Sequence, residues 1–304
     1  MNRLILSSFF CFLSLCGFGQ STDSLSSVDQ NANSLLWKIS GNGLSSSSWL
    51  FGTIHMIPEQ DFFLTEPIEN AFNESKKVVF EIDTDDMFNI TNQFSLIMKS
   101  FMNDGVKLND LLSDEDYKLV SNHFDEMGLP LMVFGRVKPM ILSIFASEDF
   151  SNPTSGMNME SIKSYELEFS EMAKKDKKTV EGLETVQFQM SMFDSIPYKD
   201  QAEMLVQTIK GETVAEDNFD EMVELYKNQD LIGLQKLIVA EEDGFMSKYD
   251  KILLVNRNKN WIEPMEEHMN QQTTFFAVGA GHLLGKNGVI NLLRQKGYTL
   301  IPVK

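Results

Sequence analysis

The chain has 304 residues, of which 44 are acidic and 26 are basic, so its formal net charge is −18 at pH 7. A chain of this length can bury a substantial core, either as one large domain or as two small ones. The acidic balance argues against nucleic acid and anionic membrane surfaces as partners, because both would repel it.

The first 19 residues have the pattern of a secretory signal peptide. Met1–Arg3 is a short basic start, and the apolar run 4–15 that follows is too short to span a bilayer. Small residues then lead to a cleavage point after Gly19. We therefore expect a secreted or periplasmic protein. Lipid anchoring at Cys16 is the second choice, because Leu15 is bulkier than the residue that usually precedes a lipidated cysteine.

Both cysteines of the chain, Cys11 and Cys16, lie inside this segment. The mature chain would therefore contain no thiol and no disulfide. Any metal ion must then be held by nitrogen and oxygen ligands. Residues 20–33 are rich in serine, asparagine and aspartate without periodicity, which predicts a flexible lead-in. We expect the remainder, 34–304, to form a single domain.

Short apolar runs rich in β-branched and aromatic residues predict strands, mainly in the two terminal thirds of the chain. These runs are 35–39, 49–51, 77–83, 179–183, 274–278 and 298–303. The first two flank a loop of glycine and serine, so we expect them to form a hairpin. Pro302 marks the last run as an edge strand.

The rest of the pattern is mainly helical, above all from about residue 87 to 261. Helices are predicted at 65–75, 113–128, 133–145, 161–176, 248–256, 261–271 and 289–296, with further amphipathic helices between 200 and 242. Pro139 predicts a kink or boundary inside the third of them. Nothing after the signal peptide predicts a membrane span. The sequence therefore predicts an α/β (α+β) fold, in which both chain ends build a central mixed sheet and a mainly helical insertion occupies about 87–261.

Two glycine turns that end in histidine each close a predicted strand, one near each end of the chain. The first runs from Gly52 to His55, and the second has Gly279 and Gly281 before His282. Ligands bind at the carboxyl ends of strands in open α/β sheets. A single histidine of this kind is more often a turn residue that bonds to the backbone, but two equivalent ones favour a shared site.

Carboxylates at strand ends complete the candidate set. Glu81 closes an apolar strand, where a carboxylate is either exposed or compensated by a metal or cation. Asp83 is expected in a supporting or exposed position, and Glu184 follows another predicted strand. Arg257, at a predicted helix end, either clamps a substrate carboxylate or oxyanion or forms a surface salt bridge. The other two histidines lie in charged helical stretches and are expected on the surface.

If the strands before these residues are adjacent and parallel, His55, Glu81 and His282 meet at one edge of the sheet. Two imidazoles and a carboxylate can hold a divalent metal ion and leave coordination positions open. Such an ion polarises a carbonyl group and activates water near neutral pH. Without a metal, the same side chains can act as general base and acid on a water molecule.

At these residues the sequence resembles the TraB/GumN family, which includes the animal Tiki proteins and is distantly similar to erythromycin esterases and a haem-binding lipoprotein family. The resemblance covers about residues 35–303 and depends on an ordered set of short segments. They are 51–55, 78–83, 182–185 with Gln187, 257–258 with Trp261, 278–283, Gly285, Gly288 and 297–298. By resemblance to the Tiki members, His55, His282 and Glu81 would be the metal-dependent peptidase residues, with Glu184 and Arg257 in support.

The first hypothesis is therefore a secreted or periplasmic metal-dependent hydrolase, most simply a peptidase that uses Mn²⁺, Co²⁺ or Zn²⁺. Its substrate would be a peptide or a small molecule. One alternative is a non-catalytic envelope protein that binds a peptide or haem. Another keeps the hydrolysis but drops the metal, with histidine as the base and an ester as the substrate. The sequence leaves the oligomeric state open.

Overall fold

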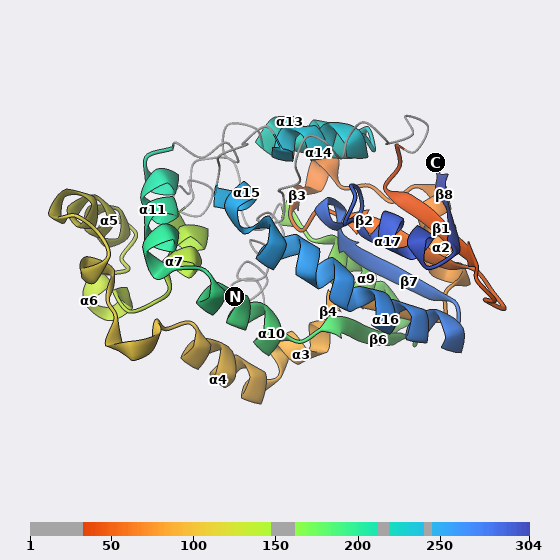
Figure 1. Cartoon of the computed structure of the whole chain (residues 1–304), viewed down its shortest axis with the longest axis horizontal. Helices are drawn as coiled ribbons and strands as arrows, with labels where there is room; N and C mark the ends of the chain where they lie inside the picture. Colours follow the sequence, from red (N-terminus) through yellow and green to blue (C-terminus); the bar gives the residue numbers. More distant parts are fainter. Residues whose placement is uncertain (1–32, 147–161, 212–218, 240–244) are drawn as a thin grey trace.

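The computed structural model of the chain describes residues 33–146, 162–211, 219–239 and 245–304 (Figure 1). The predicted signal peptide 1–19, including Cys16, lies outside the described residues, as does the predicted lead-in except for Asn33. The described chain forms one six-stranded sheet, a smaller two-stranded sheet and many helices. Among these described helices, none is both long and apolar enough to cross a membrane.

The main sheet is mixed, as predicted, and its strand order is β6-β4-β7-β2-β1-β8. The four strands β6, β4, β7 and β2 run parallel to one another, and β1 pairs antiparallel with both β2 and β8. Their bounds are β1 Leu36–Gly41, β2 Ser48–Thr53, β4 Lys77–Ile82, β6 Thr179–Glu184, β7 Thr274–Gly279 and β8 Tyr298–Val303. All residues of β2, β4 and β7 are buried, which explains their nearly continuous apolar sequences.

The predicted hairpin of β1 and β2 and the predicted edge strand β8 are both confirmed. Strands from both ends of the chain also meet at the centre, where β7 pairs with β2 on one side and β4 on the other. The region 87–261 is mainly helical but contributes β6 to the other edge of the sheet. Because β4, β7 and β2 are adjacent and parallel, their carboxyl ends lie side by side.

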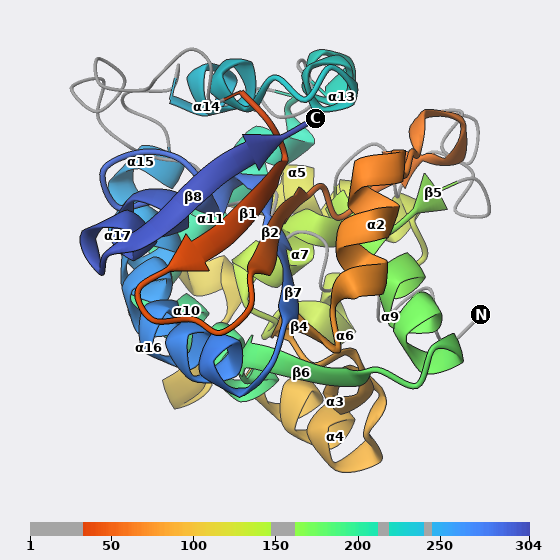
Figure 2. The same ribbon diagram turned by 90° about the vertical axis from the view of Figure 1, so that its right-hand side faces the viewer.

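Helices cover both faces of the sheet, and Figure 2 shows α2 and α9 on one face and α16 and α17 on the other. Their bounds are α2 Glu66–Glu74, α9 Tyr165–Lys175, α16 Asn256–Gln271 and α17 Val289–Gln295. On the first face Phe51, Phe72, Phe169 and Phe275 form a buried aromatic cluster with ring centroids 5.0–6.1 Å apart. On the second face the buried Trp261 of α16 belongs to the same apolar core.

A second apolar core lies among the helices of the middle region, at the left of Figure 1. Its helices are α4 Ile90–Lys99, α5 Asp114–Glu126, α6 Leu131–Phe134, α7 Pro139–Ala146, α10 Val186–Met192 and α11 Tyr198–Ile209. Ser113 caps α5, because its hydroxyl accepts a hydrogen bond from the backbone N–H of Asp116 at 3.1 Å. Helix α10 directly follows the edge strand β6 and so connects the sheet to this core.

The remaining elements are short. They are α3 Thr84–Phe88, α13 Phe219–Lys227, α14 Leu231–Val239, α15 Phe245–Asp250, strands β3 Ile57–Pro58 and β5 Ile162–Lys163, and the 3₁₀ turns η3 Glu59–Asp61, η4 Asn103–Gly105, η5 Leu108–Asp110, η7 Phe193–Ser195 and η9 Ala280–His282. Strands β3 and β5 form the two-stranded sheet, so the predicted helix 161–176 begins later, at Tyr165.

The kink or boundary predicted at Pro139, inside the helix 133–145, is confirmed as a boundary. Helix α6 ends at Phe134 and Pro139 starts α7, where its missing N–H has no helical partner to lose. The break predicted after residue 256 is wrong. The predicted helices 248–256 and 261–271 are one continuous stretch, in which the π-helical turn η8 (Lys251–Val255) joins α15 to α16. Arg257 therefore lies in the first turn of α16, directly after a π-turn, which is a feature often found at functional sites.

Candidate functional site

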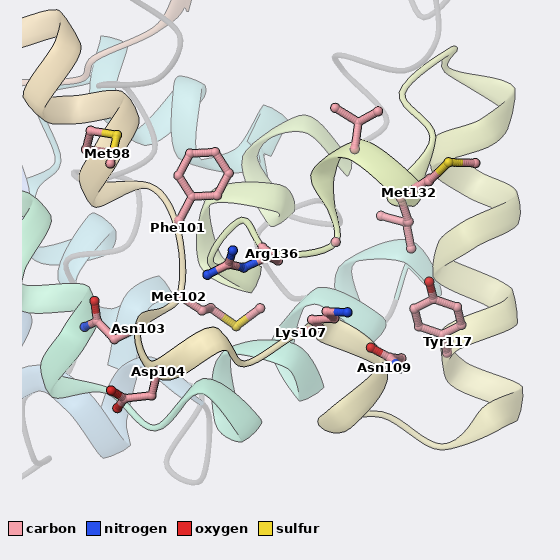
Figure 3. A pocket seen from close by; sticks show the side chains of 13 residues that line it. Met98, Phe101, Met102, Asn103, Asp104, Lys107, Asn109, Tyr117, Met132 and Arg136 are labelled. Atoms are coloured by element: carbon pink, nitrogen blue, oxygen red, sulfur yellow. The ribbon is translucent and has the colours of Figure 1, made fainter.

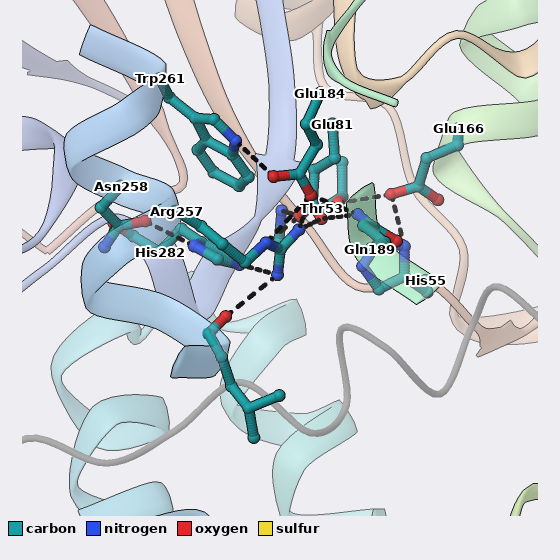
Figure 4. A network of polar contacts seen from close by, with 12 residues as sticks. Thr53, His55, Glu81, Glu166, Glu184, Gln189, Arg257, Asn258, Trp261 and His282 are labelled. Carbon is teal, nitrogen blue, oxygen red and sulfur yellow. Dashed lines mark hydrogen bonds and ion pairs between the residues drawn. The ribbon is translucent and has the colours of Figure 1, made fainter. Parts of the chain in front are cut away.

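The three residues predicted to share a site are neighbours at the carboxyl edge of the sheet (Figure 4). His55 follows β2, Glu81 lies in β4, and His282 ends the η9 turn after β7. A Cβ atom placed on Gly279 would lie 3.3 Å from Glu81 Oε1, 3.5 Å from His55 Nε2 and 3.6 Å from His282 Cδ2. The three side chains therefore converge on the backbone of Gly279, and all of them are buried.

Glu81 is an ionised, fully partnered carboxylate. Its Oε1 accepts a hydrogen bond from the backbone N–H of Gly279 at 2.9 Å, and its Oε2 contacts Arg257. Burial alone would raise the pKa of Glu81, but the positive charge of Arg257 outweighs it and, with the nearby histidines, lowers the pKa to about 2. Glu81 is therefore an acceptor-only group at neutral pH.

Arg257 uses all five of its N–H donors inside the cluster. The Nε group and one Nη2 hydrogen bond to Glu184 Oε1, at 2.9 and 2.6 Å. The other Nη2 hydrogen goes to Glu81 Oε2, while Nη1 contacts Leu253 O at 3.2 Å and His282 Nε2 at 3.1 Å. In this arrangement Arg257 anchors the two carboxylates and presents no free donor to a substrate, and the surface salt bridge that the sequence also allowed is excluded by its burial.

Glu184, at the end of β6, belongs to the same network. Besides Arg257, its Oε1 accepts a hydrogen bond from Gln189 Nε2 at 2.6 Å, and its Oε2 accepts one from Trp261 Nε1 at 2.9 Å. Arg257 and Trp261 are one helical turn apart on α16, and the guanidinium lies 4.9 Å from the centroid of the indole ring. One face of α16 thus delivers both the cation and the indole donor to Glu184.

His282 is held as a neutral imidazole. Its Nδ1 lies 2.5 Å from Asn258 Oδ1, and the Asn258 amide is oriented by a bond from its Nδ2 to Asn287 O at 2.9 Å. Asn258 Oδ1 can only accept, so the proton is on Nδ1 and the lone pair is on Nε2. Burial, reinforced by the charge of Arg257, lowers the pKa of His282 to about 3.

His55 has a different partner. Its Nδ1 lies 2.7 Å from Glu166 Oε1, a carboxylate at the start of α9. Burial lowers the pKa of His55, but the charge and the hydrogen bond of Glu166 outweigh this effect, and the net pKa is raised. Nε2 is buried and has no hydrogen-bond partner among the described residues. Within the same part of the chain, the buried Oε1 of Gln189 also lacks a partner, so this cluster contains two unsatisfied polar atoms.

Comparison with known proteins identifies the family of the chain. The pattern of the TraB/PrgY/gumN family matches residues 35–302, nearly the whole described chain. The chain belongs to this family. It is also 22% identical to "Metalloprotease TIKI1" of Xenopus tropicalis, over 98% of this chain and 68% of that protein. The TIKI1 protein of Danio rerio is 23% identical, over 98% and 71% of the two chains. "Metalloprotease TIKI2" of Xenopus tropicalis is 22% identical, over 93% and 61%. No solved structure matches the chain.

The relatives' names imply a metal for this TraB/PrgY/gumN family chain, and the donor chemistry at the sheet edge fits one in part. His55 Nε2 is an orphaned buried atom, and His282 Nε2 carries a lone pair 3.7 Å from Glu81 Oε1. Each ring has its other nitrogen held by an oxygen, as in most metal-binding histidines. Across the described ranges, however, no three His, Cys, Asp or Glu side chains form a ready ligand set. The Arg257 guanidinium contacts both Glu81 and His282.

The remaining predicted residues support the site from outside or lie elsewhere. Gly52 lets the end of β2 pack against η9, because a Cβ there would lie 3.1 Å from the Ala280 Cα atom. Gly281 lies within η9, next to His282. Asp83 does not join the cluster: it caps α3 by accepting a hydrogen bond from the backbone N–H of Asp85 at 2.9 Å.

Some residues of the cluster were not predicted from their own chemistry. Glu166 and Gln189 carried no sequence signal, because an acidic residue in the first turn of a helix and a glutamine on an amphipathic helix are both ordinary. Asn258 and Trp261 were noticed only through the family resemblance. The expectation that the other two histidines are on the surface is wrong for His268, which is buried beside Lys77 at the opposite end of β4.

A separate open pocket of about 900 Å³ lies among α4, α5 and α6 (Figure 3). Its rim carries exposed apolar side chains, and Met132 is 96% exposed. None of the lining residues belongs to the polar cluster at the sheet edge. They are Met98, Phe101, Met102, Asn103, Asp104, Lys107, Asn109, Tyr117, Leu131, Met132, Val133, Gly135 and Arg136.

Proposed function

We propose that this chain is a metal-dependent hydrolase that cleaves peptide bonds at the site formed by His55, Glu81 and His282. The observation that carries the proposal is the convergence of these three buried side chains on Gly279, with the Nε2 atom of His55 unpartnered among the described residues. The relatives named as metalloproteases support the class of reaction and favour a peptide as the substrate.

In this proposal His55, His282 and Glu81 would hold a divalent ion such as Mn²⁺, Co²⁺ or Zn²⁺ through two imidazole nitrogens and one carboxylate oxygen. When bound, the ion would supply Lewis-acid chemistry, polarising a carbonyl group and lowering the pKa of water. The protein's own contribution is orientation. Asn258 and Glu166 each engage one ring nitrogen, and burial keeps bulk water from competing for the donors.

Arg257 has two roles in this scheme. Its charge keeps Glu81 ionised, so that the carboxylate is ready to act as a ligand without losing a proton first. Its guanidinium also contacts Glu81 Oε2 and His282 Nε2, so an ion bound by both residues competes with Arg257 for the same lone pairs. Metal affinity should therefore depend on how easily the contacts of Arg257 with Glu81 and His282 are broken.

The position of Arg257 favours a second candidate, a hydrolase that works without a metal. In that case His55 is the general base, because its Nε2 lone pair is free and a carboxylate supports the opposite ring nitrogen. Glu81 and His282, both engaged by Arg257, would then be positioning residues.

We further propose that the protein works in a secreted or periplasmic setting. The support is the apolar run at residues 4–15, followed by small residues before the expected cleavage point. Fractionation of the producing cells, followed by N-terminal sequencing of the mature protein, would test this. An intact N-terminus in the cytoplasmic fraction would contradict it.

A digest of a peptide library, read by mass spectrometry, tests the reaction. We expect cleavage by the wild-type protein, its loss after exhaustive chelation, and its return when Mn²⁺, Co²⁺ or Zn²⁺ is added. His55→Ala and His282→Ala should abolish cleavage, whereas His123→Ala, on α5, should not. Activity that survives chelation but not the His55 substitution would support the metal-independent candidate. No cleavage under any of these metals would overturn peptide-bond hydrolysis.

A further inference from the structure

We propose that Glu166 is the positioning residue of His55: it fixes the imidazole in the tautomer that carries its proton on Nδ1 and aims the Nε2 lone pair into the site. The inference rests on the proposed function, because it concerns how one of the three central side chains is prepared. Glu166 belongs to α9, far from His55 in the sequence, and no other residue of that helix takes part in the cluster.

Both carboxylate oxygens of Glu166 accept hydrogen bonds from neighbouring side chains. Its Oε1 lies 2.7 Å from His55 Nδ1 and accepts a second bond from Thr53 Oγ1 at 2.7 Å. Its Oε2 accepts a bond from Ser164 Oγ at 2.9 Å. The carboxylate is thus fixed from both sides, and its side chain is only 17% exposed. An ionised carboxylate has no hydrogen to donate, so the hydrogen between it and His55 belongs to Nδ1.

The other ring nitrogen of His55, Nε2, carries the free lone pair. With the proton on Nδ1, a neutral His55 carries its lone pair on Nε2. That atom is buried, has no partner among the described residues and lies on the Gly279 side of the ring, near Glu81 Oε1. In the opposite tautomer the proton would be on Nε2, where no group accepts a hydrogen bond from it. The lone pair would then be on Nδ1 and would face the lone pairs of the Glu166 carboxylate. Both features favour the Nδ1–H form.

The Glu166 carboxylate also couples two elements. Thr53 ends β2, His55 lies in the turn that follows it, and both bond to Glu166 Oε1. Ser164, just before α9, holds the other oxygen of Glu166. The carboxylate therefore connects the N-terminal end of α9 to the turn and sets the direction of the ring. A carboxylate that is hydrogen-bonded to one ring nitrogen also makes the other nitrogen a stronger electron-pair donor to a metal ion, whereas an amide has only a weak effect of this kind.

The experiment compares Glu166→Ala, Glu166→Gln and a matched control, Glu168→Ala. Glu168 lies on the same helix and bonds to Lys163, outside the site. In chelator-treated protein with ¹⁵N-labelled histidine, at a pH high enough for His55 to be neutral, imidazole ¹⁵N shifts report the tautomer of His55. We expect the Nδ1–H form in the wild type, in Glu166→Gln and in the control, and its loss in Glu166→Ala. The Gln carboxamide oxygen can still accept from Nδ1, while its NH₂ group donates to Ser164.

The second readout is calorimetric titration of the same proteins with Zn²⁺ alone. We expect Glu166→Ala to bind Zn²⁺ 10–100-fold more weakly, Glu166→Gln to be weakened less, and the control to match the wild type (a loss of ~10–100-fold is typical for removed outer partners). Thermal melts establish that each variant is folded, and Glu166→Gln keeps the test informative if Glu166→Ala is not.

The two proposals fail in different ways. If the wild type binds no Zn²⁺ or other divalent ion, the metal-dependent function is wrong, and the tautomer result alone decides the role of Glu166. If the wild type binds Zn²⁺ but Glu166→Ala keeps both the wild-type affinity and the Nδ1–H tautomer, Glu166 is only a structural ion-pair partner and the inference is overturned.

Discussion

The two glycine–histidine turns look equivalent in the sequence but have opposite electrostatic environments. Both follow fully buried parallel strands that are neighbours in the sheet, and both bring an imidazole to Gly279. His282 meets an amide oxygen and the guanidinium of Arg257, and burial together with the charge of Arg257 lowers its pKa to about 3. His55 meets the carboxylate of Glu166, and its pKa is raised. The repeated sequence pattern places the rings, whereas the helices around them set their chemistry.

This difference follows from the architecture. The supports of His282 come from α16, which packs on one face of the sheet, and the support of His55 comes from α9, which packs on the other face (Figure 2). Two unlike helices can therefore act on neighbouring strand ends. The result is one imidazole held neutral beside a cation and one held beside an anion, both next to Gly279.

The largest effect is expected from Arg257→Met, which removes the cation on the His282 side. Glu81 and Glu184 would be left as buried carboxylates without a counter-charge. Breaking a buried ion pair in this way typically costs about 3–5 kcal/mol. We expect a loss of that size in the free energy of unfolding, measured by urea denaturation.

The matched control for this variant is Arg136→Met. Arg136 is an exposed arginine at the rim of the α4–α6 pocket, with no ion pair among those of the described chain. Its replacement should change stability by less than about 0.5 kcal/mol. Equal stabilities for the two variants would contradict the anchoring role of Arg257.

The next prediction separates the two histidines by pH, in metal-free protein. Below pH 6.5 an unfolded chain protonates His282 while the folded protein, with a pKa of about 3, does not. Stability should therefore fall as the pH falls, with a slope of about 1.4 kcal/mol per pH unit for one proton. Glu81, whose pKa is lowered from 4.5 to about 2, adds to this loss below pH 4.5.

His55 should act in the opposite direction. Because its folded-state pKa is raised above 6.5, its contribution is fully present below pH 6.5 and is lost as the pH rises through the folded-state value. Denaturation at a series of pH values tests both limbs. His282→Gln should flatten the acid limb and His55→Gln the alkaline limb, with His123→Gln as the control. If both variants changed the same limb, the contrast between the turns would be wrong.

Asn258→Asp should make the second turn resemble the first. A carboxylate would then face His282 Nδ1, as Glu166 faces His55. We expect the pKa of His282 to rise, as measured by NMR titration. Stability should fall by about 1–3 kcal/mol, because the bond from Asn258 Nδ2 to Asn287 O is lost in a buried position. An unchanged His282 pKa would show that burial and Arg257 set it without a contribution from the residue at position 258.

The smallest effect on stability is expected from Gly279→Ala. The added methyl group would meet Glu81 and the two histidines at 3.3–3.6 Å, so the free energy of unfolding should change by no more than about 1 kcal/mol. The same group would occupy the space between the three side chains. We therefore expect peptide cleavage and metal binding to fall sharply while the melting temperature barely moves. Full activity would place the functional centre elsewhere.

Much of this arrangement could be predicted from the sequence, because its strongest features are local. Apolar runs ending at Gly52 and Gly279 marked the strands and their turns, and the carboxylate at Glu81 stood out in an apolar strand. The adjacency of the strands then brought the three side chains together. Arg257 is also a candidate from the sequence, but its burial is not predicted, because the π-turn that continues the helix through residues 251–255 has no clear sequence signature.

The rest depended on long-range packing. Glu166 reads as an ordinary acidic residue of a helix start, and only the docking of α9 on the sheet brings it to His55. Asn258 and Trp261 likewise act because α16 turns one face to the strand ends. Periodicity shows that such a helix has an inward face, but it does not show which strand end that face will meet.

A metal centre shared by the two turns is tested most directly by the metal content of purified protein after reconstitution with Co²⁺, combined with the visible spectrum of the bound ion. We expect one Co²⁺ per wild-type chain, retention in His123→Ala, and loss of binding in both His55→Ala and His282→Ala, although the two histidines have such different supports. Full Co²⁺ content in both of the latter variants would contradict a centre shared by the two turns.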